Sequence, residues 1–420
     1  MTATALHSET RILPEPRYDT IDEILGPLRV LSGVRPTVLG LLSELREYIR
    51  TRCVPVEREV DNSDVIPEWF VRDMREMEMF GLTTPTEFGG RGFSLVEYAL
   101  VCREWGRVRV AFHLVTGGHN GLGVHSLMQV GTPEQKRAYL SDLVSGRLNC
   151  AFALTEPDVA GSDARGIQCT AFRQSGGWTL KGRKRFITNA AADGLITVVA
   201  KAESEKGEPL GITLFLVKGD TEGVEFTRRG TFMGAQGSPT WELTFHDVRL
   251  TDADVLGGVG QGLPVAMRTL DKSRIAIGAR ATGAAERALS YALSYSTERR
   301  SMGRSLSEHQ GVQWMLADSI VDVDLARRLA FDAAERYDKD GSANLEAAMT
   351  KMFCVESANR VVDRSIQILG GIGYSRDLPL EMLYRDLRGQ RLWDGSMEMM
   401  RVLISNRGTR GPLDRPRNAR

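Results

Sequence analysis

The segment from Phe152 to Asp163 has the residue types and spacing that point most directly to ligand chemistry. It contains an apolar run, a hydroxyl at Thr155, a proline turn and a small-residue loop with a second hydroxyl at Ser162. Gly161 lets the backbone approach a ligand closely, and the N–H groups of such a loop can bind an anion. The segment therefore favours contact with a flat heterocycle or a phosphate, although most loops of this kind are only turns.

The elements that position this loop follow from the hydrophobic periodicity. Over residues 37–147 apolar side chains recur every three or four positions, which is typical of helices. Thr132 followed by Pro133 predicts the start of one of them. Between about 150 and 255 the period changes to two, with glycine, aspartate and asparagine turns, which predicts short strands. From residue 262 the helical period returns.

The predicted fold class is therefore mainly α with a central β-domain, a small antiparallel barrel or sandwich. A length of 420 residues allows two or three domains with real cores. We expect a loose N-terminal extension at 1–36, a helical domain at 37–149, the β-domain at 150–260, a helical domain at 261–407 and a mobile tail at 408–420.

Composition excludes several classes of function. Lys+Arg and Asp+Glu both number 54, so no net field favours nucleic acid or an anionic membrane. The five cysteines and six histidines show no ligand spacing, so we expect no metal site and cysteines buried in a reducing compartment. No run approaches 18 apolar residues, and the N-terminus has no apolar signal core. The sequence predicts a cytoplasmic enzyme without a membrane span.

Four motifs, in order along the chain, resemble those of the acyl-CoA dehydrogenase family of FAD-dependent flavoproteins. They lie at residues 152–163, at 185–189 (Arg-Phe-Ile-Thr-Asn), at 298–303 (Glu-Arg-Arg-Ser-Met-Gly) with 308–310, and at 367–374 (Gln-Ile-Leu-Gly-Gly-Ile-Gly-Tyr). The resemblance covers roughly residues 38–410. It implies N-terminal helices, a β-domain and a C-terminal four-helix bundle. It also implies FAD between the β-domain and the C-terminal helices, in a homotetramer (a dimer of dimers) whose neighbouring subunits help to hold the cofactor.

The resemblance assigns the first two motifs to the flavin. The Thr155 hydroxyl would bond the pyrimidine end of the ring, and Ser162 would lie near the pyrophosphate and the substrate. The aromatic Phe186 would pack on the flavin, and the Thr188 hydroxyl would reach N5, where it tunes the reduced ring. The implied contacts are Phe152, Leu154, Thr155, Gly161, Ser162, Phe186, Ile187 and Thr188.

The third and fourth motifs are implied to hold the FAD of a neighbouring subunit. The Arg299 guanidinium suits a pyrophosphate because it can donate two parallel hydrogen bonds. Gly370 and Gly371 would end a helix and let FAD approach the backbone. The family often has an aromatic residue where Met302 stands. The implied contacts are Arg299, Ser301, Met302, His309, Gln310, Gln367, Gly370 and Gly371.

The resemblance places the catalytic base at Asp394. In the family a carboxylate here removes the α-proton of a thioester, and the backbone N–H of the same residue helps to bind the thioester oxygen. The usual residue is Glu, and Asp is shorter by one carbon–carbon bond, roughly 1.5 Å. Substrate contacts are implied for Ser162, Asp271, Arg274 and Gly395, and a cofactor contact for Ser396.

The predicted reaction is α,β-dehydrogenation of an acyl-CoA-type thioester to the trans-2-enoyl product, with electrons passed to an electron-transfer flavoprotein. Asp394 keeps alternatives open on the same fold: an acyl group on a carrier protein, or a small carbon acid such as a nitroalkane oxidised with oxygen. A third alternative is a flavin-binding scaffold without catalysis. In that case Asp394 would only cap the helix that follows it.

Overall fold

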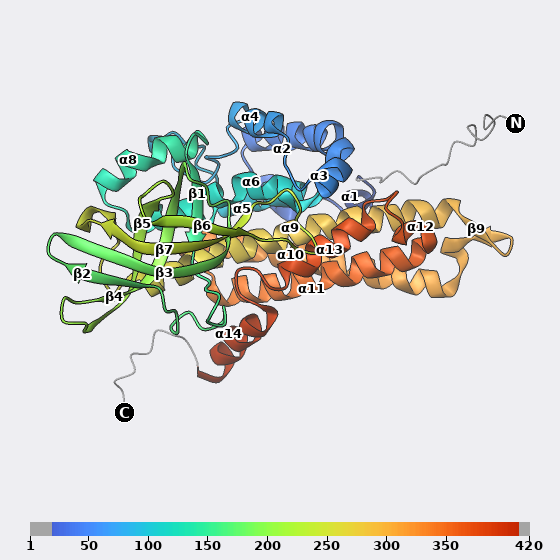
Figure 1. The fold of residues 1–420 in the computed structure, drawn as a ribbon. Helices are drawn as coiled ribbons and strands as arrows, with labels where there is room; N and C mark the ends of the chain where they lie inside the picture. Colours follow the sequence, from blue (N-terminus) through green and yellow to red (C-terminus); the bar gives the residue numbers. More distant parts are fainter. Residues whose placement is uncertain (1–18, 411–420) are drawn as a thin grey trace, which may run out of the picture.

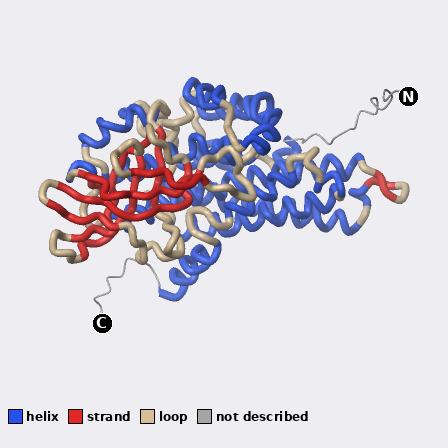
Figure 2. The backbone as a smooth tube through the Cα atoms, viewed as in Figure 1, coloured by secondary structure: helices blue, strands red, loops and turns tan. Residues whose placement is uncertain are grey.

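The computed structural model describes residues 19–410, which form a helical, a β and a second helical region in that order (Figure 1). The order predicted from periodicity is confirmed. Figure 2 shows the large sheet at one end of the molecule and the long helices running away from it to a short two-stranded hairpin at the other end. Among the described residues, no helix is both long enough and apolar enough to cross a membrane.

The N-terminal region is a set of helices packed on one long helix of the C-terminal region. The expected helix start at Thr132 is present as a capping box, in which the Thr132 and Gln135 side chains each bond the other's backbone N–H. The helices are α1 (Asp19–Leu25), α2 (Pro36–Tyr48), α3 (Glu57–Ser63), α4 (Glu68–Glu76), α5 (Leu95–Gly106), α6 (Val110–Asn120), α7 (Leu122–Val130) and α8 (Pro133–Val144). Single turns of 3-10 or π helix at Arg29–Gly33, Ile49–Cys53, Val54–Val56 and Thr86–Phe88 lie between them.

The loose extension expected at 1–36 is wrong from Asp19 onward. Ile21 is buried, and the Asp22 carboxylate accepts from Arg103 Nη2 at 3.0 Å and from Arg327 Nη2 at 2.8 Å. The buried Ile21 and Val30 and the shared Asp22 carboxylate thus fix a segment whose sequence shows little periodicity. Residues 1–18 lie outside the described part. So does most of the expected mobile tail, at 411–420, whereas 408–410 belong to a helix.

The central region is one eight-stranded sheet in the order β6-β7-β3-β2-β4-β5-β8, with β1 paired to β4. Most pairs are antiparallel as expected, but β1 and β2 each run parallel to β4. The strands are β1 (Asn149–Ala153), β2 (Thr170–Gln174), β3 (Gly177–Thr188), β4 (Gly194–Glu203), β5 (Pro209–Lys218), β6 (Val224–Arg229), β7 (Thr240–Leu250) and β8 (Val255–Leu256). A 3-10 turn at Asp252–Asp254 precedes β8.

The C-terminal region is built on three long helices that lie side by side (Figure 1). α5 approaches α9 closely, since a Cβ on Gly283 would lie 1.9 Å from the Arg103 carbonyl oxygen. The elements are α9 (Gly262–Glu298), the hairpin β9 (Arg300–Ser301) and β10 (Arg304–Ser305), a turn at Leu306–Glu308, α10 (Gln310–Asp340), α11 (Asn344–Leu369), α12 (Gly371–Tyr374), α13 (Leu380–Gln390) and α14 (Met397–Arg410).

Candidate active site

Asp394 lies in the short loop between α13 and α14, and its backbone is left-handed. Its φ is 51° and that of Gly395 is 94°. For a residue with a side chain this conformation costs about 1–2 kcal/mol, so surrounding contacts must hold it. Arg274 on α9 donates through Nε to the Asp394 carbonyl oxygen at 3.2 Å. Lys351 on α11 donates through Nζ to the carbonyl oxygens of Trp393 and Gly395.

The Asp394 carboxylate points to α9, where its Oδ2 accepts a hydrogen bond from the Ser273 hydroxyl. The N-terminus of α14 is served by a different side chain, because Ser396 Oγ accepts from the Met399 N–H at 3.5 Å. The Asp394 carboxylate is therefore hydrogen-bonded to α9, and the Ser396 hydroxyl accepts the hydrogen bond at the N-terminus of α14. That arrangement favours a chemical role for the carboxylate over a capping role.

The predicted substrate residues Asp271 and Arg274 lie beside this loop as a buried ion pair. Arg274 Nη1 is 3.0 Å from Asp271 Oδ1, and Asn344 Nδ2 also donates to that oxygen at 3.0 Å. Burial raises the pKa of the Asp271 carboxyl, and the Arg274 charge opposes that rise. Because Arg274 also holds the Asp394 carbonyl oxygen, the pair connects the substrate side of α9 to the backbone that carries the candidate base.

Lys351 is a site residue that sequence reasoning missed. It is fully buried on α11, and burial lowers the pKa of its ammonium to about 8. The only signal in the sequence is a lysine on a face that is otherwise small and apolar, between Ala348 and Cys354. A buried lysine needs acceptors, and here they are backbone carbonyls of the Asp394 loop.

The end of β1 and the start of the next loop are fixed to β3 by a second missed pair, Glu156 and Lys184. Both side chains are buried, with Lys184 Nζ 2.7 Å from Glu156 Oε1. Lys184 Nζ also donates to the Leu154 carbonyl oxygen at 2.9 Å, and the Arg185 N–H donates to the Thr155 carbonyl oxygen at 2.8 Å. The two motifs expected to hold the flavin ring are thereby brought together.

The Gly161–Ser162 loop folds back over Thr155. A Cβ placed on Gly161 would lie 3.5 Å from Thr155 Cγ2, an ordinary van der Waals distance, so the loop passes directly beside Thr155. Ser162 and Gly161 are exposed, while Phe152, Leu154 and Thr155 are half-buried. The first motif therefore presents backbone and hydroxyl groups to the outside of the sheet.

Phe186 projects from a bulge in β3. The pairing of β3 with β7 shifts register between Lys184 and Ile187, and Phe186 has φ 62° and a half-exposed ring. Its ring centroid is 5.9 Å from that of Phe232, which is also exposed. Ile187 returns to the core, and Thr188 Oγ1 lies 3.4 Å from Thr240 Oγ1. A strained, outward aromatic pair beside Thr155 offers a surface that fits a flat ring.

The third and fourth motifs lie at the opposite end of the bundle from the sheet (Figure 1). The hairpin is exposed from Arg300 to Arg304. Met302 is 93% accessible, and the Ser301 carbonyl oxygen accepts from His309 Nε2 at 3.1 Å. Gly370 ends α11 with φ 64°, and neither it nor Gly371 has an atom within 4 Å of its Cβ position. Within one chain, the structure does not bring these residues to Asp394. The whole set is Arg299, Ser301, Met302, His309, Gln310, Gln367, Gly370 and Gly371.

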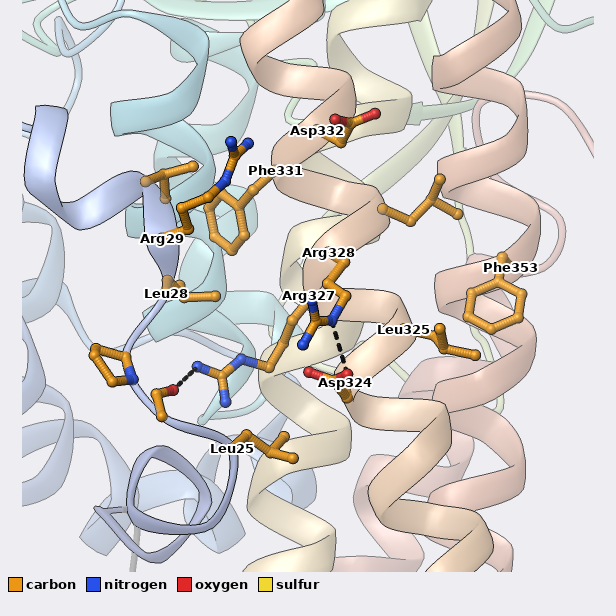
Figure 3. Close-up of a pocket in the computed structure, with 14 residues that line it drawn as sticks. Leu25, Leu28, Arg29, Asp324, Leu325, Arg327, Arg328, Phe331, Asp332 and Phe353 are labelled. Carbon is orange, nitrogen blue, oxygen red and sulfur yellow. Dashed lines mark hydrogen bonds and ion pairs between the residues drawn. The ribbon is translucent and has the colours of Figure 1, made fainter.

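A groove of about 580 Å³ lies between the segment 25–30 and α10. Its lining includes the ion pair Arg328–Asp324 at 2.8 Å, and Arg327 Nη2 donates to the Gly26 carbonyl oxygen at 3.0 Å (Figure 3). None of the predicted site residues lines it. No group of His, Cys, Asp and Glu that could hold a metal ion is found within residues 19–410.

Three consecutive parts of the chain match descriptions of one family. Residues 38–147 match the acyl-CoA dehydrogenase N-terminal domain, 151–248 the middle domain and 260–409 the C-terminal domain. The chain belongs to the acyl-CoA dehydrogenase family. It is an FAD-dependent oxidoreductase that acts on acyl-CoA, as the sequence motifs predicted.

Known relatives and a solved structure match this chain over most of its length. An acyl-CoA dehydrogenase of Bacillus subtilis is 33% identical over 86% of this chain and 95% of its own. The Caffeyl-CoA reductase-Etf complex subunit CarC of Acetobacterium woodii is 33% identical over 83% of this chain and 91% of its own. The structure of butyryl-CoA dehydrogenase from Megasphaera elsdenii is 30% identical, covers 89% of this chain and 98% of its own, and superposes with a TM-score of 0.83.

Proposed function

We propose that this acyl-CoA dehydrogenase oxidises the Cα–Cβ bond of its acyl-CoA with Asp394 as the base. The observation that carries the proposal is the Asp394 carboxylate, held at Ser273 by a loop that α9 and α11 fix from two sides. Asp394 takes the α-proton. Bound FAD supplies the acceptor for the hydride that leaves Cβ. The bond electrons left at Cα form the double bond of the trans-2-enoyl product, so two hydrogens leave and the thioester stays intact.

The backbone of the same loop supports a second role. Lys351 and Arg274 occupy the carbonyl oxygens of Trp393, Asp394 and Gly395. The Asp394 N–H donates no hydrogen bond within the described residues. A fixed, unoccupied donor next to the base suits the thioester oxygen, where negative charge develops as the α-proton leaves.

We propose an electron-transfer flavoprotein as the acceptor that reoxidises the enzyme, because the Acetobacterium relative is named as a subunit of an Etf complex. Because Asp394 stands where the family usually has Glu, two alternatives to an acyl-CoA substrate stay open: an acyl group on a carrier protein, and a nitroalkane oxidised with oxygen. Anaerobic mixing with acyl-CoAs, acyl carrier proteins and nitroalkanes, followed by oxygen, separates them. A dehydrogenase bleaches with its thioester and reoxidises slowly in oxygen. An oxidase reoxidises quickly, and a scaffold never bleaches. The cytoplasmic location stays a prediction.

The purified protein should be yellow, with about one FAD per chain. The reason is the pairing of the Leu154–Thr155 backbone with the Phe186 bulge through Glu156 and Lys184, which forms a surface that suits a flat ring. The visible spectrum and the FAD released on denaturation measure the ratio. A colourless protein whose spectrum is unchanged after added FAD contradicts the assignment.

We further propose a homotetramer in which the hairpin and the α11 end complete the FAD site of a neighbour. Their exposure and their distance from the sheet in one chain support this arrangement. Arg299→Ala should lower FAD affinity by about tenfold or more, because a charge-assisted hydrogen bond is worth about 1.5–3 kcal/mol. Equilibrium FAD titration of the apoprotein measures the effect, with thermal unfolding of the apoprotein unchanged.

Arg304→Ala is the matched control, because Arg304 is an exposed arginine of the same hairpin. It should keep the FAD affinity of the natural chain. Equal losses in both variants would indicate a general effect of hairpin charge. An Arg299→Ala tetramer with unchanged affinity would remove Arg299 from the cofactor site.

A further inference from the structure

Arg280 on α9 is a buried cation without a carboxylate partner in the described chain. Its exposed fraction is 4%, and its Nε makes no hydrogen bond. The other buried arginines among residues 19–410 each form an ion pair with a carboxylate: Arg103, Arg107, Arg109, Arg274, Arg287 and Arg327. An arginine does not lose its proton in a protein, so Arg280 keeps an interior charge that no ion pair neutralises.

The group that Arg280 contacts directly is neutral, while the carboxylates that act on its charge, Asp394 and Asp386, form no ion pair with it. Arg280 Nη1 donates to His113 Nδ1 at 2.7 Å. His113 Nε2 lies 3.3 Å from Tyr98 Oη and 3.7 Å from Cys102 Sγ. Burial, aided by the Arg280 charge, holds the pKa of His113 well below its usual range, so the imidazole stays neutral and accepts. This contact orients one side of the guanidinium and leaves its charge in place.

The guanidinium has a second side that remains free. Nε and Nη2 point the same way and form the fork with which an arginine binds a carboxylate through two parallel hydrogen bonds. Neither nitrogen has a hydrogen-bond partner within the described residues. A fork with a buried, unpartnered Nε and an unbonded Nη2 fits a planar anion better than it fits an alkyl chain.

Arg280 shares a helix face with the residue that contacts the base. Ser273, whose hydroxyl bonds Asp394, lies seven positions earlier, and seven residues are almost two turns of α9. The two side chains therefore leave α9 in nearly the same direction, about 10 Å apart along its axis. Asp271 lies on the opposite side of Ser273 along the helix. A thioester whose α-carbon is at Asp394 and whose CoA passes Asp271 would send its acyl tail toward Arg280.

We propose that Arg280 binds a carboxylate at the far end of the acyl group, so that the substrate is the CoA thioester of a short dicarboxylic acid. This inference rests on the proposed dehydrogenation at Asp394 and names its substrate class. The ω-carboxylate fills the Nε–Nη2 fork and compensates the buried charge. His113 is the positioning residue that holds the guanidinium from the other side.

Equilibrium binding in the Asp394→Asn background, which should bind thioesters without reducing flavin, tests the inference without turnover. Calorimetry on the FAD-loaded enzyme compares glutaryl-CoA with pentanoyl-CoA, which carries a methyl group in place of the carboxylate, and with the neutral amide glutaramoyl-CoA. Glutaryl-CoA should bind about tenfold to a hundredfold more tightly than either, as expected for charge-assisted hydrogen bonds. Arg280→Gln should remove this preference, and Arg280→Lys should keep part of it because the charge remains and the fork does not.

The outcomes separate the two proposals. Equal binding of the three thioesters, or an unchanged preference in Arg280→Gln, overturns the carboxylate site. Glutaramoyl-CoA binding as tightly as glutaryl-CoA overturns it as well, because recognition would then need no charge. If Arg280→Gln does not fold, two measurements still test the site. Arginine at position 280 should give the preference for glutaryl-CoA, and His113→Asn should weaken that preference. Selective binding without anaerobic bleaching of the natural enzyme would support the Arg280 site and refute the proposed dehydrogenation.

Discussion

Asp394→Asn should abolish flavin reduction while FAD and acyl-CoA binding remain. The amide is nearly the same size, its oxygen can still accept from Ser273, and the backbone N–H at this position is unchanged. It cannot take the α-proton, and loss of a positioned general base alone costs about a hundredfold to ten-thousandfold. Anaerobic stopped-flow bleaching with the cognate thioester measures the reduction rate. Calorimetry measures binding in the same samples.

The same variant distinguishes catalysis from helix capping, because Asn and Asp cap about equally well. Reduction at nearly the natural rate would mean that the base lies elsewhere. Asp394→Glu is the companion variant. It lengthens the arm by roughly 1.5 Å, to the residue that is usual in the family. We expect it to retain measurable reduction, with a changed preference among acyl groups.

The order of the three regions could be predicted because each has a periodic pattern over many residues. The spacing in α2 and the alternation in β7 report one buried face, and that face is what packing selects. The segment at 19–36 could not be predicted in this way. Its contacts depend on Ile21 and Asp22, and the partners of Asp22 are 81 and 305 residues away.

Some residues of the candidate site could be predicted from the sequence, and others could not. Asp394, Phe186 and Thr155 stand in short motifs that local sequence reveals. Lys351 and the Glu156–Lys184 pair hold these residues in place. Their side chains are charged, and charged side chains are normally expected at the surface. Only the fold shows that they are buried and that they bond the backbone of the motifs. Pairwise contacts between distant elements leave no periodic trace in one sequence.

Lys351→Met should lower the rate of flavin reduction about a hundredfold with little change in FAD content. Methionine has a similar volume, but it leaves the carbonyl oxygens of Trp393 and Gly395 without their donor. The left-handed backbone at Asp394 then loses one of its two supports, and a displacement of about 1 Å at a reacting group can cost about a hundredfold. Bleaching kinetics measure the loss. An unchanged rate would show that Arg274 alone holds the loop.

The pH dependence of stability shows whether Lys351 is buried as described. Burial lowers its pKa from 10.5 to about 8 in the folded chain, so between these values the unfolded chain binds more protons. This group therefore makes the free energy of unfolding rise with pH from about 8 to about 10.5, and its cost is fully present below pH 8. Urea unfolding of the natural chain and Lys351→Met across this range should differ by that rise. Lys339→Met, at the exposed end of α10, is the matched control and should follow the natural chain.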